Sequence, residues 1–173
     1  GATYADHQSS GYDVEYCSWS NVPDEDFALA DDYDWTIGQF VWTGFDYLGE
    51  PSPYDTDAWP SHSSVFGIID LASLPKDRYY LYRSIWNKTA NTLHVLPHWT
   101  WPGREGENTP VFVYTSYPAA ELFVNGKSCG KKNVENCLAV FDVVLPFGSS
   151  TLEAKGFGEK LTVDAGRKDG NTE

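Results

Sequence analysis

Apolar and polar positions along the chain change their pattern near residue 90. Before that point, "NVPDEDFALADDY" predicts a helix with Asn21 as its N-cap, Pro23 in its first turn and acids at 24–26 near the positive end of the helix dipole. The following "WTIGQFVWTGF" is apolar on both faces, which is typical of a parallel strand covered on both sides. Residues 49–64, rich in Pro, Ser and Asp, predict a loop, and "PKDRYYLYRSIWN" predicts a second helix.

The order helix, strand, long loop and helix is typical of an α/β architecture. The loop follows the carboxyl end of the predicted strand, where α/β folds carry their functional side chains. A complete TIM barrel needs about 250 residues, so residues 1–90 have room for one or two of its eight units. Because such a partial TIM-barrel segment does not close by itself, we expect its apolar faces to be buried against another polypeptide.

From residue 92 onward the chain reads as all-β. Short alternating runs are separated by turn signals, in "LHVLPHW", "PVFVYTS", "AAELFVNGKSCG", "CLAVFDVVL" and "STLEAKGF". The Asn-Gly pair at 125–126 predicts a type I′ hairpin. These runs predict an immunoglobulin-like β-sandwich over residues 91–160, followed by a polar, frayed tail over 161–173. The fold class is therefore multidomain, α/β plus all-β.

Charge narrows the classes of partner. The chain carries 25 acidic against 12 basic side chains, a formal net charge of −13. Nucleic acids and anionic membranes both require Lys and Arg to neutralise phosphate, so neither is an expected partner. A neutral carbohydrate is not repelled. The aromatic share of 16% fits either a sugar-recognition surface, where flat rings stack on sugar faces, or a ring-rich sandwich core.

The spacing of cysteine and histidine residues predicts no metal site, and no cofactor is predicted. Cys129 and Cys137 flank a short polar segment and could pair across a hairpin, but free thiols are favoured, and Cys17 has no partner in the sequence. His94 and His98 lie four apart in a predicted strand region, so they do not share a face as helical metal ligands would. No signal-peptide or membrane-spanning pattern occurs, and localisation stays open, with the periplasm or extracellular space favoured over the cytoplasm.

Three ordered stretches carry a family resemblance: "GQFVWTGFDYLGEPSPY", "WPSHSSVFGIIDLASLPKDRYYLYRSIWN" and "LHVLPHWTWPGREGENTPVFVYTSYPAAELFVNGKS". Through them the chain resembles glycoside hydrolase family 2, in particular bacterial β-galactosidase-like members with an extra β-sandwich after the barrel. The resemblance implies that "FVWTGFDY" is the eighth barrel strand and "PKDRYYLYRSIWN" the last barrel helix. It also implies that the all-β part is the first sandwich after the barrel.

The resemblance assigns a limited share of the active site to this chain. Retaining glycosidases use two carboxyl groups about 5–5.5 Å apart, and in the family both are glutamates upstream of the eighth strand. The sequence motifs around these two glutamates are both absent from this chain. No catalytic residue is therefore predicted, and the isolated chain is expected to be inactive. By position, Trp42 matches the family's tryptophan beneath the sugar, which is followed by a cis peptide, here to Thr43; the alternative is that Trp42 is simply a buried ring of the barrel. Asp46 either accepts hydrogen bonds from sugar hydroxyls or orients a neighbouring loop.

Other side chains are candidates for substrate contact. Glu50 lies in the loop after Trp42, where neither catalytic glutamate belongs, so loop capping or aglycone contact is expected of it rather than catalysis. His62, in the same loop, could rim the pocket. Trp99 and Trp101 form either a sugar-stacking platform or a surface that packs against the barrel, and packing is favoured.

Two classes of function follow. The first is part of a retaining β-glycosidase, most simply a β-galactosidase that hydrolyses terminal β-linked sugars. It would act with the missing N-terminal part of the enzyme or a partner chain, and its ligand would be the carbohydrate substrate. The alternative is a non-catalytic β-sandwich module for carbohydrate binding or domain packing.

Overall fold

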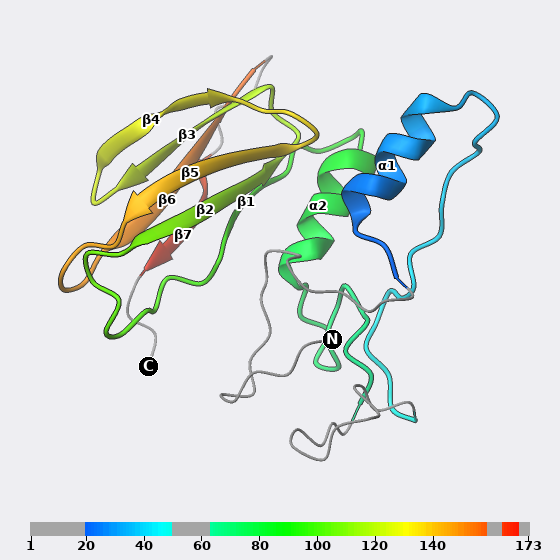
Figure 1. Cartoon of the computed structure of the whole chain (residues 1–173), viewed down its shortest axis with the longest axis horizontal. Coiled ribbons are helices and arrows are strands. Elements are labelled where there is room, and N and C mark those ends of the chain that lie inside the picture. Colours follow the sequence, from blue (N-terminus) through cyan, green and yellow to red (C-terminus); the bar gives the residue numbers. More distant parts are fainter. Residues whose placement is uncertain (1–19, 50–62, 159–163, 170–173) are drawn as a thin grey trace. The chain divides into compact units, whose positions relative to one another are not determined.

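The chain contains two compact units, Gly1–Lys76 and Asp77–Glu173, which are described separately. The computed structural model describes residues 20–49, 63–158 and 164–169 (Figure 1). The sequence pattern changes near residue 90, but the compact units meet after Lys76, so the second helix belongs with the β-rich unit. The domain boundary at residue 90, which comes from the change in sequence pattern, stays a prediction.

The first helix forms where the sequence predicts it. Helix α1 spans Pro23–Asp32, with proline in the first turn and three acidic side chains close behind it. Its N-cap is Val22, which offers no side-chain acceptor, so the prediction of Asn21 as N-cap is wrong. The Asn21 side chain instead donates to Asp26 Oδ1 at 3.2 Å. Because that amide contacts a side chain one turn into the helix, it does not cap the backbone N–H groups.

The predicted strand at residues 35–45 does not form in the described residues, so the strand prediction is wrong: Trp35 lies in a turn, and the chain bends at Trp42 and Gly44. Its one ladder contact is an isolated parallel bridge between Phe45 and Ile69. Ile37 and Phe40 are fully exposed. A strand that is apolar on both faces needs neighbouring strands to supply hydrogen bonds and cover, and the described residues provide only the segment around Ile69.

The second unit is a two-sheet antiparallel sandwich (Figure 1). Its strands follow the predicted runs, and the type I′ turn is confirmed because Asn125 and Gly126 both have positive φ. One sheet has the order β1-β2-β5 and the other β4-β3-β6-β7. The strands are β1 Leu93–Leu96, β2 Asn108–Thr115, β3 Ala119–Val124, β4 Lys127–Asn133, β5 Leu138–Val144, β6 Thr151–Phe157 and β7 Asp164–Asp169.

The two sheets share one apolar core. Alternate residues of β5 point inward, and Phe141 at its centre is 1% exposed. Leu122 of β3 and Leu152 of β6 enter the same cluster from the other sheet. Inward-facing apolar residues from both sheets are what makes a sandwich stable in water. The two-sheet antiparallel arrangement agrees with the predicted class, while the immunoglobulin-like assignment stays a prediction.

Strand β7 corrects the prediction of a frayed tail. Residues 164–169 pair antiparallel with β6 and add an edge strand to the four-stranded sheet. The polar composition of "DAGRKD" concealed this strand, because an edge strand can carry polar side chains on both faces. In the same sandwich, Cys129 and Cys137 are free thiols, as favoured from the sequence, and Cys17 lies outside the described residues.

Helix α2, Asp77–Trp86, packs on the three-stranded sheet. Leu81 forms a buried cluster with Leu96 and Tyr114. Near the start of the helix, Asp77 Oδ1 lies 2.6 Å from His94 Nε2, and the His94 ring stacks on a helix tyrosine. No described helix is long and apolar enough to cross a membrane.

Candidate functional site

The corner at Trp42 is the centre of the candidate site. The Trp42–Thr43 peptide bond is cis, as predicted from the resemblance. The Trp42 side chain is 74% exposed, and its ring meets the ring of Tyr47 edge-on, with centroids 6.2 Å apart. A large ring thus stands free on a defined backbone corner. Such a surface can stack on the C–H face of a sugar.

Backbone hydrogen bonds fix this corner to a second segment of the same unit. Residues 43–47 run beside residues 64–69, and amides from both sides donate across the gap. Both donors and acceptors belong to backbone groups, so the fit does not depend on flexible side chains. The bonds run from Thr43 N to Phe66 O at 3.4 Å, Ile68 N to Thr43 O at 3.0 Å, Ile69 N to Gly44 O at 3.0 Å, Asp46 N to Ile69 O at 2.9 Å and Ser64 N to Tyr47 O at 2.8 Å.

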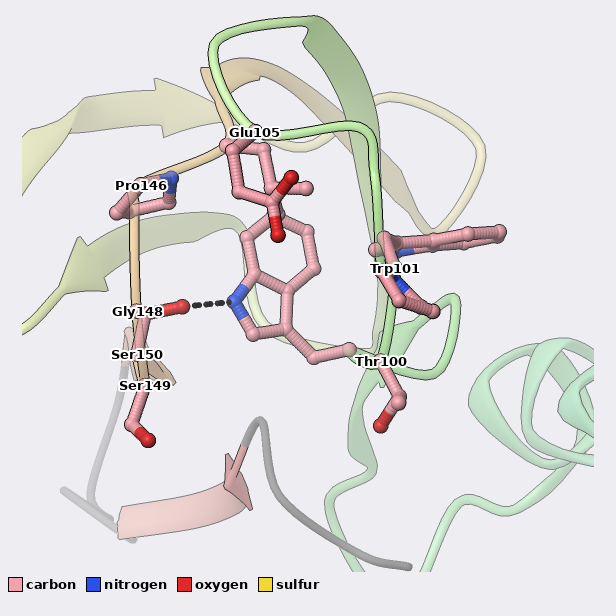
Figure 2. A pocket seen from close by; sticks show the side chains of 10 residues that line it. Thr100, Trp101, Glu105, Pro146, Gly148, Ser149 and Ser150 are labelled. Carbon is pink, nitrogen blue, oxygen red and sulfur yellow. Dashed lines mark hydrogen bonds between the residues drawn. The ribbon is translucent and has the colours of Figure 1, made fainter.

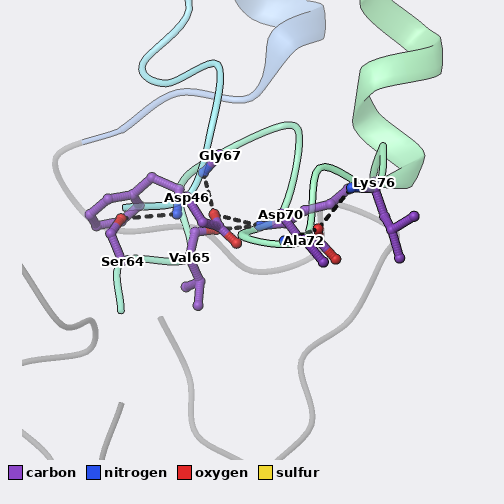
Figure 3. Close-up of polar contacts among 9 residues, drawn as sticks. Asp46, Ser64, Val65, Gly67, Asp70, Ala72 and Lys76 are labelled. Atoms are coloured by element: carbon purple, nitrogen blue, oxygen red, sulfur yellow. Dashed lines mark hydrogen bonds and ion pairs between the residues drawn. The ribbon is translucent and has the colours of Figure 1, made fainter. Parts of the chain in front are cut away.

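Asp46 lies inside the corner. Its side chain is 8% exposed. Oδ1 accepts two hydrogen bonds of 2.8 Å each, one from the backbone N–H of Gly67 and one from Lys76 Nζ (Figure 3). Lys76 Nζ also donates to the carbonyl of Val65 at 3.1 Å. This geometry favours the loop-orienting alternative for Asp46 over direct acceptance of sugar hydroxyls.

Gly67 is required where it stands. A Cβ added to it would lie 2.1 Å from Asp46 N and 2.4 Å from the carbonyl carbon of Phe45. Both neighbours are backbone atoms that cannot move aside. The sequence showed Gly67 only as a break in "VFGIIDL", and Lys76 only as a lysine near the start of the predicted second helix. Neither signal separates these residues from ordinary loop residues, so both were missed.

The other loop candidates lie outside the described residues. Glu50 and His62 belong to the segment 50–62, so their predicted contacts stay predictions. Among the described residues, no group of three or more His, Cys, Asp and Glu side chains could hold a metal ion.

The two tryptophans of "PHWTWPG" have different environments. Trp99 is 4% exposed and belongs to the sandwich core, where its Nε1 donates to Ser150 Oγ at 2.8 Å. Trp101 is half-buried, stacked on His98 with ring centroids 4.3 Å apart and covered on its π-system by the Arg104 guanidinium at 5.0 Å. Trp99 is therefore a core ring, and Trp101 already has partners on its ring.

A hollow of about 300 Å³ lies beside these tryptophans, between the loop after β1 and the loop after β5 (Figure 2). Its lining residues include Trp99 together with the polar residues Thr100, Glu105 and Ser149. Phe147, in the loop after β5, is 82% exposed. The indole N–H of Trp101 is buried, and the described residues provide no hydrogen-bond partner for it.

Comparisons with known proteins place this geometry among glycoside hydrolases. A family model described as "Domain of unknown function (DUF4982)" matches residues 106–163, within the sandwich unit. The β-galactosidase BoGH2A of Bacteroides ovatus is 43% identical over 153 residues, which cover 87% of this chain and 17% of the relative. A putative β-glucuronidase of Formosa agariphila is 38% identical over 133 residues, 73% of this chain and 12% of the relative.

Solved structures agree. A β-glycosidase from Bacteroides vulgatus matches 85% of this chain and 18% of that chain, with a TM-score of 0.70 and 37% identity. A glycosyl hydrolase family 2 member from Bacteroides cellulosilyticus matches 85% of this chain and 20% of that chain, with a TM-score of 0.65 and 26% identity. The chain spans less than a fifth of the length of the β-galactosidase of Bacteroides ovatus and of the putative β-glucuronidase of Formosa agariphila.

Proposed function

The chain belongs to glycoside hydrolase family 2, and we propose that it supplies the last part of the (β/α)8 barrel and the β-sandwich that follows. The intact enzyme would hydrolyse terminal β-linked sugars with retention, and a β-galactoside is the first candidate substrate. The observation that carries the proposal is the Trp42 ring, exposed on a corner that is fixed by backbone hydrogen bonds.

In this proposal Trp42 supports the sugar and does not perform the chemistry. A ring face offers polarisable area to the C–H side of a pyranose and excludes water from that side. The carboxylate nucleophile and the general acid, which retaining hydrolysis requires, come from the part of the enzyme upstream of this chain. The side chains of Glu50 and His62 are proposed substrate contacts from the adjoining loop.

The exposed apolar side chains of the first unit support the proposal that the rest of a barrel covers them. Trp35, Ile37 and Phe40 are exposed along one segment. Large exposed apolar patches on soluble proteins mark sites of interaction with other protein surfaces. The proposed cover is the remainder of the same barrel, which would place strands on both sides of residues 35–45.

Activity of the chain alone and of the intact enzyme tests the proposal. The isolated chain should not hydrolyse a chromogenic β-galactoside above background, whereas the intact enzyme should. In the intact enzyme, Trp42→Ala should lower kcat/KM by more than about tenfold, which corresponds to about 1.4 kcal/mol of transition-state stabilisation. Turnover by the isolated chain, or a smaller loss in the variant, would count against the assigned roles.

The sugar itself is the finer part of the proposal. The curated relatives carry the names β-galactosidase and β-glucuronidase, and 43% identity to the galactosidase supports a galactoside. Measuring kcat/KM on matched chromogenic galactoside and glucuronide substrates decides between them. We expect the galactoside to be the better substrate, and a preference for the glucuronide would reject this assignment.

A second candidate function is carbohydrate binding by the sandwich. The hollow beside Trp99 favours it, because Thr100, Glu105 and Ser149 are among its lining residues and Phe147, in the loop that forms one wall, is exposed. Calorimetric titration of the chain with neutral oligosaccharides should then give binding that Glu105→Ala and Phe147→Ala both weaken. Absence of binding to any neutral oligosaccharide tried would leave domain packing as the role of this surface.

A further inference from the structure

We propose that Lys76 is a positioning residue for Trp42, acting through the buried carboxylate of Asp46. The inference rests on the proposed role of Trp42 beneath the sugar. It adds a residue 34 positions further along the chain, at the end of the same compact unit. Neither Lys76 nor its contact with Asp46 follows from the sequence pattern.

The chain is folded back so that Lys76 can reach Asp46. After Ile69 a tight turn forms around Asp70, whose Oδ1 accepts hydrogen bonds from the amides of Ala72 and Leu74, both at 2.8 Å. The amide of Lys76 then donates to the carbonyl of Ile68 at 2.9 Å. Backbone hydrogen bonds thus hold Lys76 beside the segment that pairs with the Trp42 corner, independently of the contacts of its side chain (Figure 3).

The side chain of Lys76 joins the two segments of the corner. One ammonium group donates to Asp46 Oδ1 at 2.8 Å and to Val65 O at 3.1 Å. Asp46 belongs to the segment that carries Trp42, and Val65 to the segment opposite. A lysine ammonium has three donors and a full charge, so it can hold both acceptors at once.

Loss of this ammonium would leave a buried charge without its counterion. The Asp46 side chain is 8% exposed and the Lys76 side chain 33%. Removing one member of such a pair is costly, because the remaining carboxylate is left buried without an opposing charge unless it moves toward water. Movement of Asp46 would pull on its bond to the Gly67 amide and displace the backbone four residues after Trp42.

The arrangement leaves little freedom to absorb such a displacement. Gly67 lies so close to Asp46 and Phe45 that even a methyl group would collide with their backbone atoms. The corner therefore moves as one body, and the Trp42 ring moves with it. A misplacement of about 1 Å in a substrate-positioning group can cost on the order of 100-fold in rate.

A double-mutant cycle in the intact enzyme tests the inference. Lys76→Met should lower kcat/KM by at least about tenfold, mainly through kcat, because a displaced ring supports the transition state less well. In a Trp42→Ala background the same change should cost less than about twofold, since the ring through which Lys76 acts is gone. Lys76→Arg, which keeps the charge and the donors, should restore part of the loss.

One control variant and one replacement variant keep the test decisive. Lys88→Met removes a lysine whose ammonium also donates to a backbone carbonyl, that of Ile85 at 2.6 Å, and it should change kcat/KM by less than about twofold. If Lys76→Met does not fold, as judged by thermal unfolding, Lys76→Gln takes its place in the cycle, because the amide keeps two N–H donors without the charge.

The outcomes separate the inference from the function on which it rests. A damaging Trp42→Ala with a silent Lys76→Met, or with losses that multiply in the double variant, overturns the positioning role alone. A silent Trp42→Ala overturns the sugar-floor proposal and the positioning role with it. Coupled losses, with partial recovery in Lys76→Arg, are the result expected.

Discussion

The two compact units differ in how deeply they bury large aromatic side chains. In the sandwich, Phe141 and Trp99 are buried between two sheets. In the first unit, Trp35 and Phe40 are exposed. One sequence therefore contains a region with its own apolar core and a region in which several large apolar side chains are exposed.

In the described residues, the corner of the first unit is held by hydrogen bonds and not by an apolar core. They include backbone hydrogen bonds and those of the buried carboxylate of Asp46 with Gly67 and Lys76. Hydrogen bonds are directional, so they can fix a local geometry without a large apolar core. The comparison indicates that hydrogen bonds shape the corner locally, and we propose that the exposed segment beside it gains stability from the rest of the barrel.

The largest contrast is expected from truncating one phenylalanine in each unit. Phe141→Ala should lower the free energy of unfolding of the sandwich by about 3–5 kcal/mol, because it removes a buried ring and leaves a cavity. Phe40→Ala in the isolated chain should change it by less than about 0.5 kcal/mol, since that ring is already in solvent. Chemical denaturation followed by circular dichroism measures both. Equal losses would remove the contrast between the units.

A methyl group at Gly67 should disrupt the corner of the first unit. Gly67→Ala is expected to cost about 1–3 kcal/mol locally, because its Cβ would collide with the backbone of Asp46 and Phe45. Gly44→Ala is the matched control, since no heavy atom lies within 4 Å of its added Cβ. Hydrogen exchange at the Ile69 amide, which donates to Gly44 O, reports the opening. Similar exchange rates in the two variants would contradict this account.

Removing the hydrogen-bond acceptor of the buried Trp99 indole should have a smaller effect on stability. Ser150→Ala should destabilise the sandwich by about 1–2 kcal/mol, because the Trp99 indole N–H is left buried without an acceptor. Ser128→Ala removes an exposed hydroxyl that donates to Glu121 and should cost less than about 0.5 kcal/mol. Thermal unfolding of the two variants compares them, and a larger loss at Ser128 would be the unexpected result.

The smallest effect concerns pH and a thiol at the margin of the sandwich core. Burial raises the pKa of Cys137, with nearby Lys88 opposing the shift. As pH rises past the ordinary thiol pKa of about 8.5, the unfolded chain loses this proton first, so the folded state loses stability until the raised pKa is passed. Comparison with Cys137→Ala across pH 8–10 isolates this slope. A slope of the opposite sign would contradict burial as the dominant cause.

Much of the fold was predictable because its signals are local. Alternation in "CLAVFDVVL" and the Asn-Gly turn at 125–126 depend on neighbouring residues only, and both elements formed as expected. The segment at 35–45 was misread because its apolar pattern describes a strand among partners that the described residues do not supply. Strand β7 was missed for the reverse reason, since its polar residues gain their order from pairing with β6.

The candidate site was predictable only in part. Trp42 and its cis peptide came from the family resemblance, and the exposed ring fits a sugar-contact role. Lys76 could not be found, because its role comes from a turn that brings it back to a residue 30 positions earlier. For Asp46, the sequence left a sugar contact and a loop-orienting role equally open, and only its burial and its bond to Gly67 favour the second.

We expect the rest of the barrel to cover the exposed side chains of Trp35, Ile37 and Phe40 in the intact enzyme, while the Trp42 ring stays open to the sugar. Hydroxyl-radical footprinting of the isolated chain and of the intact enzyme tests it most directly. Oxidation of Trp35 and Phe40 should be fast in the isolated chain and several-fold slower in the intact enzyme, while Phe141 should be protected in both. Equal oxidation of Trp35 and Phe40 in the two samples would contradict the claim.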